Sequence, residues 1–122
     1  MFTGLVQKVA QVTAVQHRGS SAIIELDLGD LAAEVRKGDS VMVDGACLTA
    51  TSGSGQRVGF DASAETLRLT TLGGLRRGTR VNVELAMRPT DRFGGHFVSG
   101  HVDGVGRRPL VEAGISTRRY VL

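Results

Sequence analysis

The sequence predicts an all-β fold, a six-stranded antiparallel Greek-key barrel with one or two short helices. Glycine is frequent, at 17 of 122 residues, and short runs of Val, Ile, Leu and Thr alternate with turn residues. Both features are typical of turn-rich β proteins. Aromatic residues make up only 4% of the chain, so the core must be mostly aliphatic. The length fits one compact domain and is short for two of ordinary size.

Six short segments are predicted as strands. They cover residues 5–15, 22–28, 40–43, 47–51, 57–62 and 80–85, and turn residues separate them at 17–20, 44–45 and 52–55. The last segment alternates strictly between apolar and polar residues and is the clearest strand. This alternation predicts that Val81, Val83 and Leu85 point into the barrel.

Two further segments favour short helices. Residues 30–35 predict one or two helical turns, with Asp30 as the N-cap and Gly38 ending the segment. Ser63 is the expected N-cap of a second helix that continues through Leu67. A full capping box needs Glu or Gln where this chain has Thr66.

Charge and cysteine content exclude several classes of protein. The net charge of +3 is small, and part of the excess lies in the Arg pairs at 107–108 and 118–119, so we expect no nucleic-acid partner. The single cysteine, Cys47, cannot form an internal disulfide, which favours a reducing compartment. The first residues lack the features of a signal peptide, and no apolar run is long enough to span a bilayer. We therefore expect a cytoplasmic protein with no membrane partner.

A weak internal repeat divides the chain. Residues 2–6, Phe-Thr-Gly-Leu-Val, align with residues 98–102, Val-Ser-Gly-His-Val, and the same offset matches Val9 with Val105. It also matches Val15 with Val111 and Leu26 with Leu122. We expect a barrel at 1–97 and the truncated start of a second, similar barrel at 98–122.

We expect residues 98–122 to be loosely ordered, or held by the first barrel or by another copy of the chain, because a lone hairpin is marginal in water. Their removal is then expected to leave the thermal stability of the first barrel nearly unchanged.

Four motifs resemble the riboflavin synthases, whose alpha chain has two such barrels. They are the opening Met-Phe-Thr-Gly-Leu-Val, the Asp-Gly-Ala-Cys-Leu-Thr at 44–49, the Ala-Glu-Thr-Leu at 64–67 and the Gly-Gly-His-Phe-Val-Ser-Gly-His-Val-Asp-Gly at 94–104. The resemblance extends over essentially the whole chain. It implies the amino-terminal barrel of such an enzyme, followed by the start of the second.

The resemblance also implies a reaction. Two molecules of 6,7-dimethyl-8-ribityllumazine dismutate: one donates a four-carbon unit to the other, giving riboflavin and a ribitylamino-pyrimidinedione. No metal or redox cofactor takes part. The family site lies between the first barrel of one subunit and the second barrel of another within a trimer, so we expect a homo-oligomer.

Matched motif by motif, the resemblance implies three candidate catalytic residues: Cys47, Ser40 and His101. The implied substrate-binding residues are Gly4, Leu5, Val6, Cys47, Leu48, Thr49, Asp61, Ala62, Ser63, Ala64, Glu65, Thr66, Gly100, His101 and Val102. Each has a plainer interpretation as well. Cys47 can be an inert small hydrophobic residue, Ser40 a turn hydroxyl and Glu65 a solvated carboxylate, whereas His96 and His17 are expected to be structural and surface residues.

Three functions remain open from the sequence. The first is riboflavin synthase, for which we expect inefficient catalysis by this chain without the rest of a second barrel. The second is a non-catalytic lumazine- or flavin-binding barrel resembling the lumazine proteins. The third is an unrelated interaction barrel.

Overall fold

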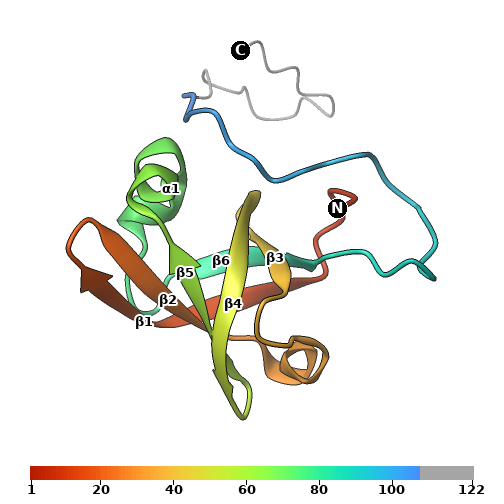
Figure 1. Ribbon diagram of the computed structural model, residues 1–122, viewed down its shortest axis with the longest axis horizontal. Helices are drawn as coiled ribbons and strands as arrows, with labels where there is room; N and C mark the ends of the chain where they lie inside the picture. The colour runs from red at the N-terminus through yellow and green to blue at the C-terminus, as the bar shows by residue number, and fades with distance from the viewer. Residues whose placement is uncertain (108–122) are drawn as a thin grey trace, which may run out of the picture.

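A computed structural model of the chain describes residues 1–107 and confirms the predicted barrel (Figure 1). Six antiparallel strands close in the order β1-β2-β5-β4-β3-β6. The strands are β1 (Lys8–Arg18), β2 (Ser21–Asp27), β3 (Ser40–Val43), β4 (Ala46–Ser54), β5 (Arg57–Ala62) and β6 (Arg80–Leu85). The helical turns are η1 (Gly29–Glu34), α1 (Ala64–Leu69) and η2 (Thr71–Gly74). None of the helices in the described part is long and apolar enough to cross a membrane.

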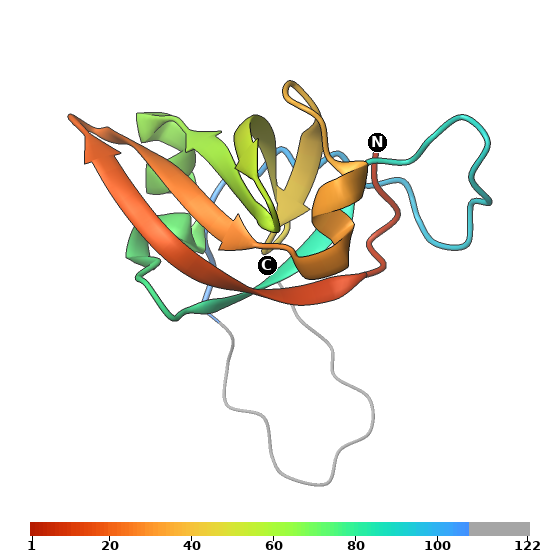
Figure 2. The same cartoon turned by 90° about the horizontal axis from the view of Figure 1, so that it is seen from below.

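The barrel closes between the two ends of its sequence. β1 pairs with β2 along most of its length, and its first residues pair with β6, so that Lys8 lies opposite Val83. β6 pairs in turn with β3, where Val43 also lies opposite Val83. Figure 2 shows β1 and β6 crossing at the base of the barrel, with α1 and η2 at one end and η1 at the other. Within residues 1–107 each strand thus has a paired strand on both sides.

Aliphatic side chains fill the barrel, as the composition predicts. The fully buried side chains of the inner cluster include Val12, Ile24, Leu26, Leu28, Val41, Val43, Phe60, Leu72, Val81 and Val83. The inward orientation of Val81 and Val83 is confirmed. Leu85 is only half-buried against this cluster, while Glu84 beside it is buried, so the alternation of β6 breaks at its end.

The turns and caps confirm some local predictions and correct others. Asp44 and Gly45 have φ angles of 46° and 83° and form the tight turn between β3 and β4. This left-handed geometry favours an Asp-Gly pair. Ser63 caps α1 as predicted, because its Oγ accepts a hydrogen bond of 3.2 Å from Thr66 N. The prediction of Asp30 as an N-cap is wrong. Leu28 occupies that position of η1 without a side-chain cap bond.

Two strand boundaries also differ from the prediction. β1 begins at Lys8 and continues through His17, which was expected in a turn, because β2 pairs along it as far as the turn at 19–20. β4 extends to Ser54, through residues that were expected to form a loop. A register shift between Ala50 and Ser52 absorbs the irregularity, and the pairing with β5 then continues.

After β6 the chain makes a wide loop and returns past the amino terminus (Figure 1). Met87 N donates to Met1 O at 3.0 Å, and His96 N donates to Thr3 O at 2.8 Å. Phe2 and Val98 then form an antiparallel bridge. Residues 98–107 belong to the expected second domain, and the remainder of that domain, with Val111 and Leu122 of the repeat, lies outside the described residues.

Candidate functional site

Three predicted site residues form a row across adjacent strands. Ser40 on β3 lies opposite Thr49 on β4, and Thr49 lies opposite Asp61 on β5. Directly paired residues project to the same side of a sheet. Their neighbours Val41, Leu48 and Phe60 point into the core, so this row lies on the outer face of the barrel.

Cys47 lies on the same outer face, two residues before Thr49. Its Sγ is free, and the residue is half-buried. It lies opposite Met42 on β3, which is buried although it is outside the inner cluster. Segments outside the barrel therefore cover this part of the outer face.

Residues 98–102 form part of that cover. Cys47 N donates to Gly100 O at 2.9 Å, and Val102 packs against the core cluster. Gly100 has a φ of 76°, and an added Cβ would lie 2.9 Å from Cys47 Cβ. Only glycine permits this approach together with this backbone conformation.

The helix α1 borders the same face. Because β5 runs antiparallel to β4, the end of β5 that leads into Ser63 lies at the same end of the barrel as Cys47. Figure 1 shows α1 at that end, with the returning chain passing above it. Ala64 and Glu65 are exposed, and Thr66 is half-buried with its Oγ1 3.0 Å from Ser63 Oγ.

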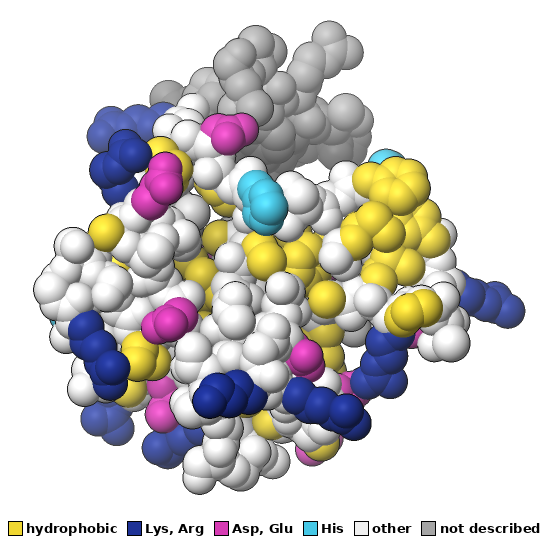
Figure 3. All heavy atoms as spheres, in the orientation of Figure 1, with side chains coloured by type: hydrophobic (Ala, Val, Ile, Leu, Met, Phe, Trp, Pro, Cys, Tyr) yellow, Lys and Arg dark blue, Asp and Glu magenta, His cyan; other side chains and the backbone are white. Residues whose placement is uncertain are grey.

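Two of the predicted site residues do not present their side chains on this face. Leu48 and Ala62 alternate with the outer residues and have their side chains in the core. His101 is exposed, and its N–H donates to Ser99 Oγ at 3.2 Å. In Figure 3 a histidine side chain lies beside a hollow in this face, and hydrophobic side chains form part of the hollow's floor.

Gly4, Leu5 and Val6 follow the Phe2–Val98 bridge along the chain. An added Cβ on Gly4 would lie 3.5 Å from Val98 Cγ2. Leu5 and Val6 are 55% and 54% exposed. Of this segment, Gly4 thus lies beside Val98.

An exposed hydrophobic group accompanies this segment. The rings of Phe93 and Phe97 stack with their centroids 4.6 Å apart, and Phe97 is 80% exposed. An added Cβ on Gly94 would lie 3.9 Å from Leu5 Cδ1. Figure 3 shows hydrophobic side chains gathered on this side of the face. Exposed groups of this kind commonly mark an interface.

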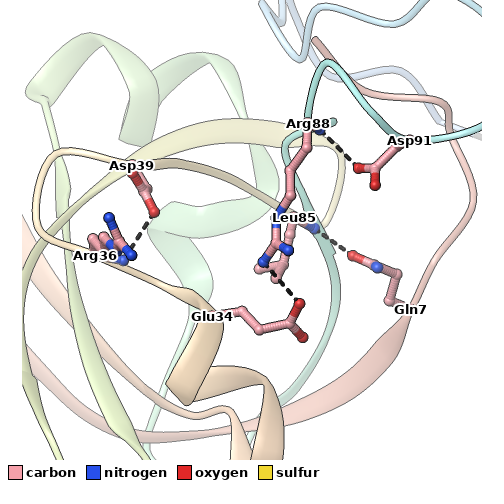
Figure 4. Close-up of polar contacts among 7 residues, drawn as sticks. All are labelled: Gln7, Glu34, Arg36, Asp39, Leu85, Arg88 and Asp91. Atoms are coloured by element: carbon pink, nitrogen blue, oxygen red, sulfur yellow. Dashed lines mark hydrogen bonds and ion pairs between the residues drawn. The ribbon is translucent and has the colours of Figure 1, made fainter.

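A separate cavity of about 660 Å³ lies between the returning loop, β6 and η1. Leu5 and Ser40 line it, whereas Cys47, Thr49 and Thr66 do not. Figure 4 shows polar contacts at its wall, where an Arg88 Nη donates to Glu34 Oε1 at 3.0 Å and Arg88 N donates to Asp91 Oδ2 at 2.7 Å. The cavity therefore adjoins the outer-face row at Ser40 but does not extend to Cys47 or Thr49 on β4.

Sequence reasoning missed Glu84. It is 5% exposed, lies on β6 opposite Met42, and so extends the row from Cys47 through Met42 to a third strand. Its two carboxylate oxygens accept hydrogen bonds from Thr3 N at 2.7 Å and Gly4 N at 2.8 Å. In the alternating sequence of β6 a glutamate at this position predicts an exposed side chain, so the pattern gave no signal.

The donor groups do not form a metal site. Among residues 1–107, no three or more His, Cys, Asp and Glu side chains gather closely enough to hold a metal ion. The outer face instead offers hydroxyl, carboxylate and thiol groups beside a closely packed backbone. Such a surface suits a flat organic ligand with polar edges.

Comparison with known proteins identifies the family of the chain. Residues 3–86 match the family described as "Lumazine binding domain". The chain belongs to this family. This lumazine-binding domain is 42% identical over 112 residues to the riboflavin synthase of Bacillus amyloliquefaciens, and 41% identical over 106 residues to that of Actinobacillus pleuropneumoniae. The alignments cover 92% and 87% of this chain but 52% and 49% of the relatives, so the chain spans about half their length.

Solved structures resemble the same domain. LumP complexed with 6,7-dimethyl-8-(1'-D-ribityl) lumazine has a TM-score of 0.76 at 27% identity, over 85% of this chain and 58% of that one. LumP complexed with riboflavin has a TM-score of 0.75 at 28% identity, over 85% and 56%. The lumazine-binding domain therefore shares its barrel with proteins that hold these two ligands.

Proposed function

We propose that the domain binds 6,7-dimethyl-8-ribityllumazine and riboflavin on the outer face of β3, β4 and β5, as one half of a riboflavin synthase site. The observation that carries this proposal is the convergence of three segments distant in sequence. Residues 47–49, 61–66 and 100–102 meet at one end of the barrel, through the pairing of β4 with β5 and the bond from Cys47 N to Gly100 O.

The chemistry of this face matches the ligands. Thr49, Asp61 and Thr66 supply hydroxyl and carboxylate groups for the polar edge of the pyrimidine ring and the ribityl hydroxyls. The backbone of Gly100 and the Cys47 side chain offer a close surface for the flat ring. The ligands named for the LumP structures have both parts.

Catalysis requires a second ligand held against the first. One lumazine must lose a proton from a ring methyl, and a nucleophile must add to the other, before a four-carbon unit passes between them. We assign proton transfer to His101, whose imidazole can both accept and donate a proton, and binding or assisting roles to Cys47 and Ser40. The proposal requires no metal or redox cofactor.

The second ligand needs a second barrel. We propose that Gly4–Val6 serve that partner barrel, within a homo-oligomer that is a trimer for the complete enzyme. The exposed group around Leu5 and Phe97 supports a partner at this side of the domain. A reducing, cytoplasmic location fits the free Cys47.

Fluorescence titration with riboflavin and with 6,7-dimethyl-8-ribityllumazine tests the binding site. Thr49→Ala is expected to weaken binding by about tenfold, as the loss of one buried hydrogen bond does. Ser54→Ala is the matched control, because Ser54 is exposed at the opposite end of the same strand. Equal affinities for the two variants would contradict the location of the site.

Incubation with the lumazine distinguishes the remaining functions. Riboflavin formation by the chain, or by the chain joined to a second barrel, supports the synthase. Binding without turnover in both forms supports a carrier of the lumazine-protein kind. If neither ligand binds, the proposed function is wrong and an interaction barrel is favoured.

A further inference from the structure

We infer that Glu84 is a positioning residue for the ligand site, acting through the amino-terminal segment and the Phe2–Val98 bridge. The inference rests on the proposed function, since it concerns the same face. Glu84 does not itself lie among residues 47–49, 61–66 or 100–102. Its effect on a ligand must therefore pass through the segments that it holds.

In the first link, the Glu84 carboxylate accepts hydrogen bonds from two successive backbone N–H groups. Glu84 Oε2 accepts from Thr3 N at 2.7 Å, and Oε1 accepts from Gly4 N at 2.8 Å. Thr3 Oγ1 lies 3.4 Å from Oε2. Within the described residues Glu84 has no ion pair, so these bonds are what satisfies a 95% buried carboxylate.

The second link is the pairing of this segment with the returning chain. Phe2 N donates to Val98 O at 2.9 Å, and Val98 N donates to Phe2 O at 3.1 Å. His96 N donates to Thr3 O at 2.8 Å, so the pairing continues next to the residue that Glu84 holds. Phe2 is 1% exposed and anchors the pair on the barrel.

The third link returns to the site. Two residues beyond Val98, Gly100 O accepts the bond from Cys47 N, and Val102 packs on the core cluster. Glu84 and Cys47 lie in one row on either side of Met42. The bridge thus spans the outer face from the Glu84 end of this row to the Cys47 end. If the amino-terminal segment lost its bonds to Glu84, residues 98–102 would lose the strand pairing that holds them in place.

The test is Glu84→Gln in the full chain. Glutamine keeps the size of the side chain but offers one acceptor oxygen, and its amide group presents donors to the second N–H. We expect the affinity for riboflavin to fall about tenfold. A loss of this size corresponds to a free protein in which the binding-competent conformation is populated about one-tenth of the time. Amide hydrogen exchange at Thr3 and Gly4 should accelerate in the same variant.

The matched control is Gln7→Ala. Gln7 Oε1 accepts from Leu85 N at 2.6 Å, next to Glu84 on β6, but makes no part of the bridge. The Gln7→Ala variant should bind riboflavin with the same affinity as the unsubstituted chain. Affinities are measured well below the melting temperature of each variant. A Glu84→Gln variant that melts earlier but binds equally well would overturn the inference, because the role of Glu84 would then be structural alone.

Val98→Pro tests the chain of contacts independently, because proline removes the Val98 N–H while leaving Glu84 in place. We expect a comparable loss of affinity, and no further loss when Glu84→Gln is added. Unchanged affinity of Val98→Pro would overturn the inference even if Glu84→Gln did not fold, and additive losses would also overturn it. If the unsubstituted chain binds neither ligand, the proposed function fails, while hydrogen exchange still reports whether Glu84 holds Thr3 and Gly4.

Discussion

Phe2 and Val98 hydrogen-bond each other reciprocally, through bonds of 2.9 Å and 3.1 Å, and occupy equivalent positions of the internal repeat. Two aligned residues that pair in this way are related by a local two-fold axis. Gly4 and Gly100 follow them at equivalent positions, and both have positive φ angles, of 84° and 76°. The start expected of the second barrel therefore lies on the first, whereas Gly4, Leu5 and Val6 are exposed.

Gly100→Ala is expected to weaken riboflavin binding by at least about tenfold, because the left-handed conformation costs an alanine about 1–2 kcal/mol and its Cβ would meet Cys47. Isothermal titration or ligand fluorescence measures the change. Gly104→Ala is the control, since an added Cβ there has open space around it. Equal binding by both variants would show that Gly100 does not support the ligand.

Ending the chain at residue 97 tests the domain boundary. From the sequence alone, removal of 98–122 should leave thermal stability nearly unchanged. The structure shows that Val98, Gly100 and Val102 contact the first barrel, so we now expect a measurable fall in melting temperature and a loss of ligand affinity. An unchanged melting temperature and affinity would restore the original boundary and remove residues 100–102 from the site.

Phe60→Ala is expected to lower the free energy of unfolding by about 3–5 kcal/mol, because the side chain is completely buried in the barrel. Urea denaturation measures this change. Val105→Ala, which truncates a residue that is 60% exposed, should stay within about 0.5 kcal/mol. A small effect of Phe60→Ala would contradict the assignment of the core.

Ser63→Ala removes the N-cap of α1 and is expected to cost about 1 kcal/mol of stability. It should also weaken ligand binding, because Ser63 Oγ fixes both the N–H and the hydroxyl of Thr66. Thermal melting and titration separate the two effects. Stability lost without any loss of affinity would remove Thr66 from the site.

The sequence predicted the barrel well because its strands are local patterns. Strict alternation gave the inner residues Val81 and Val83, and the Asp-Gly pair gave the β3–β4 turn. Asp30 was misplaced as a cap because η1 begins directly from Leu28 with 3₁₀ geometry, where Asp27 Oδ1 accepts the bond from Gly29 N.

The site was harder to predict, since its geometry depends on distant pairings. The motif residues could be identified from the sequence. Which of them face outward follows only from the register of β3, β4 and β5, which places Cys47, Thr49 and Asp61 on the outer face and Leu48 in the core. Glu84 could not be found at all. Its hydrogen-bond partners are two backbone groups 80 and 81 residues away.

Closure of the barrel between β1 and β6 also has a kinetic consequence. Lys8 pairs with Val83, and Phe2 with Val98, so the chain must bring its beginning against its end before either contact stabilises it. Proteins dominated by such non-local pairings fold on a timescale of about milliseconds to seconds. During synthesis the first strand must therefore wait, without its second neighbour, until residues 80–83 have left the ribosome.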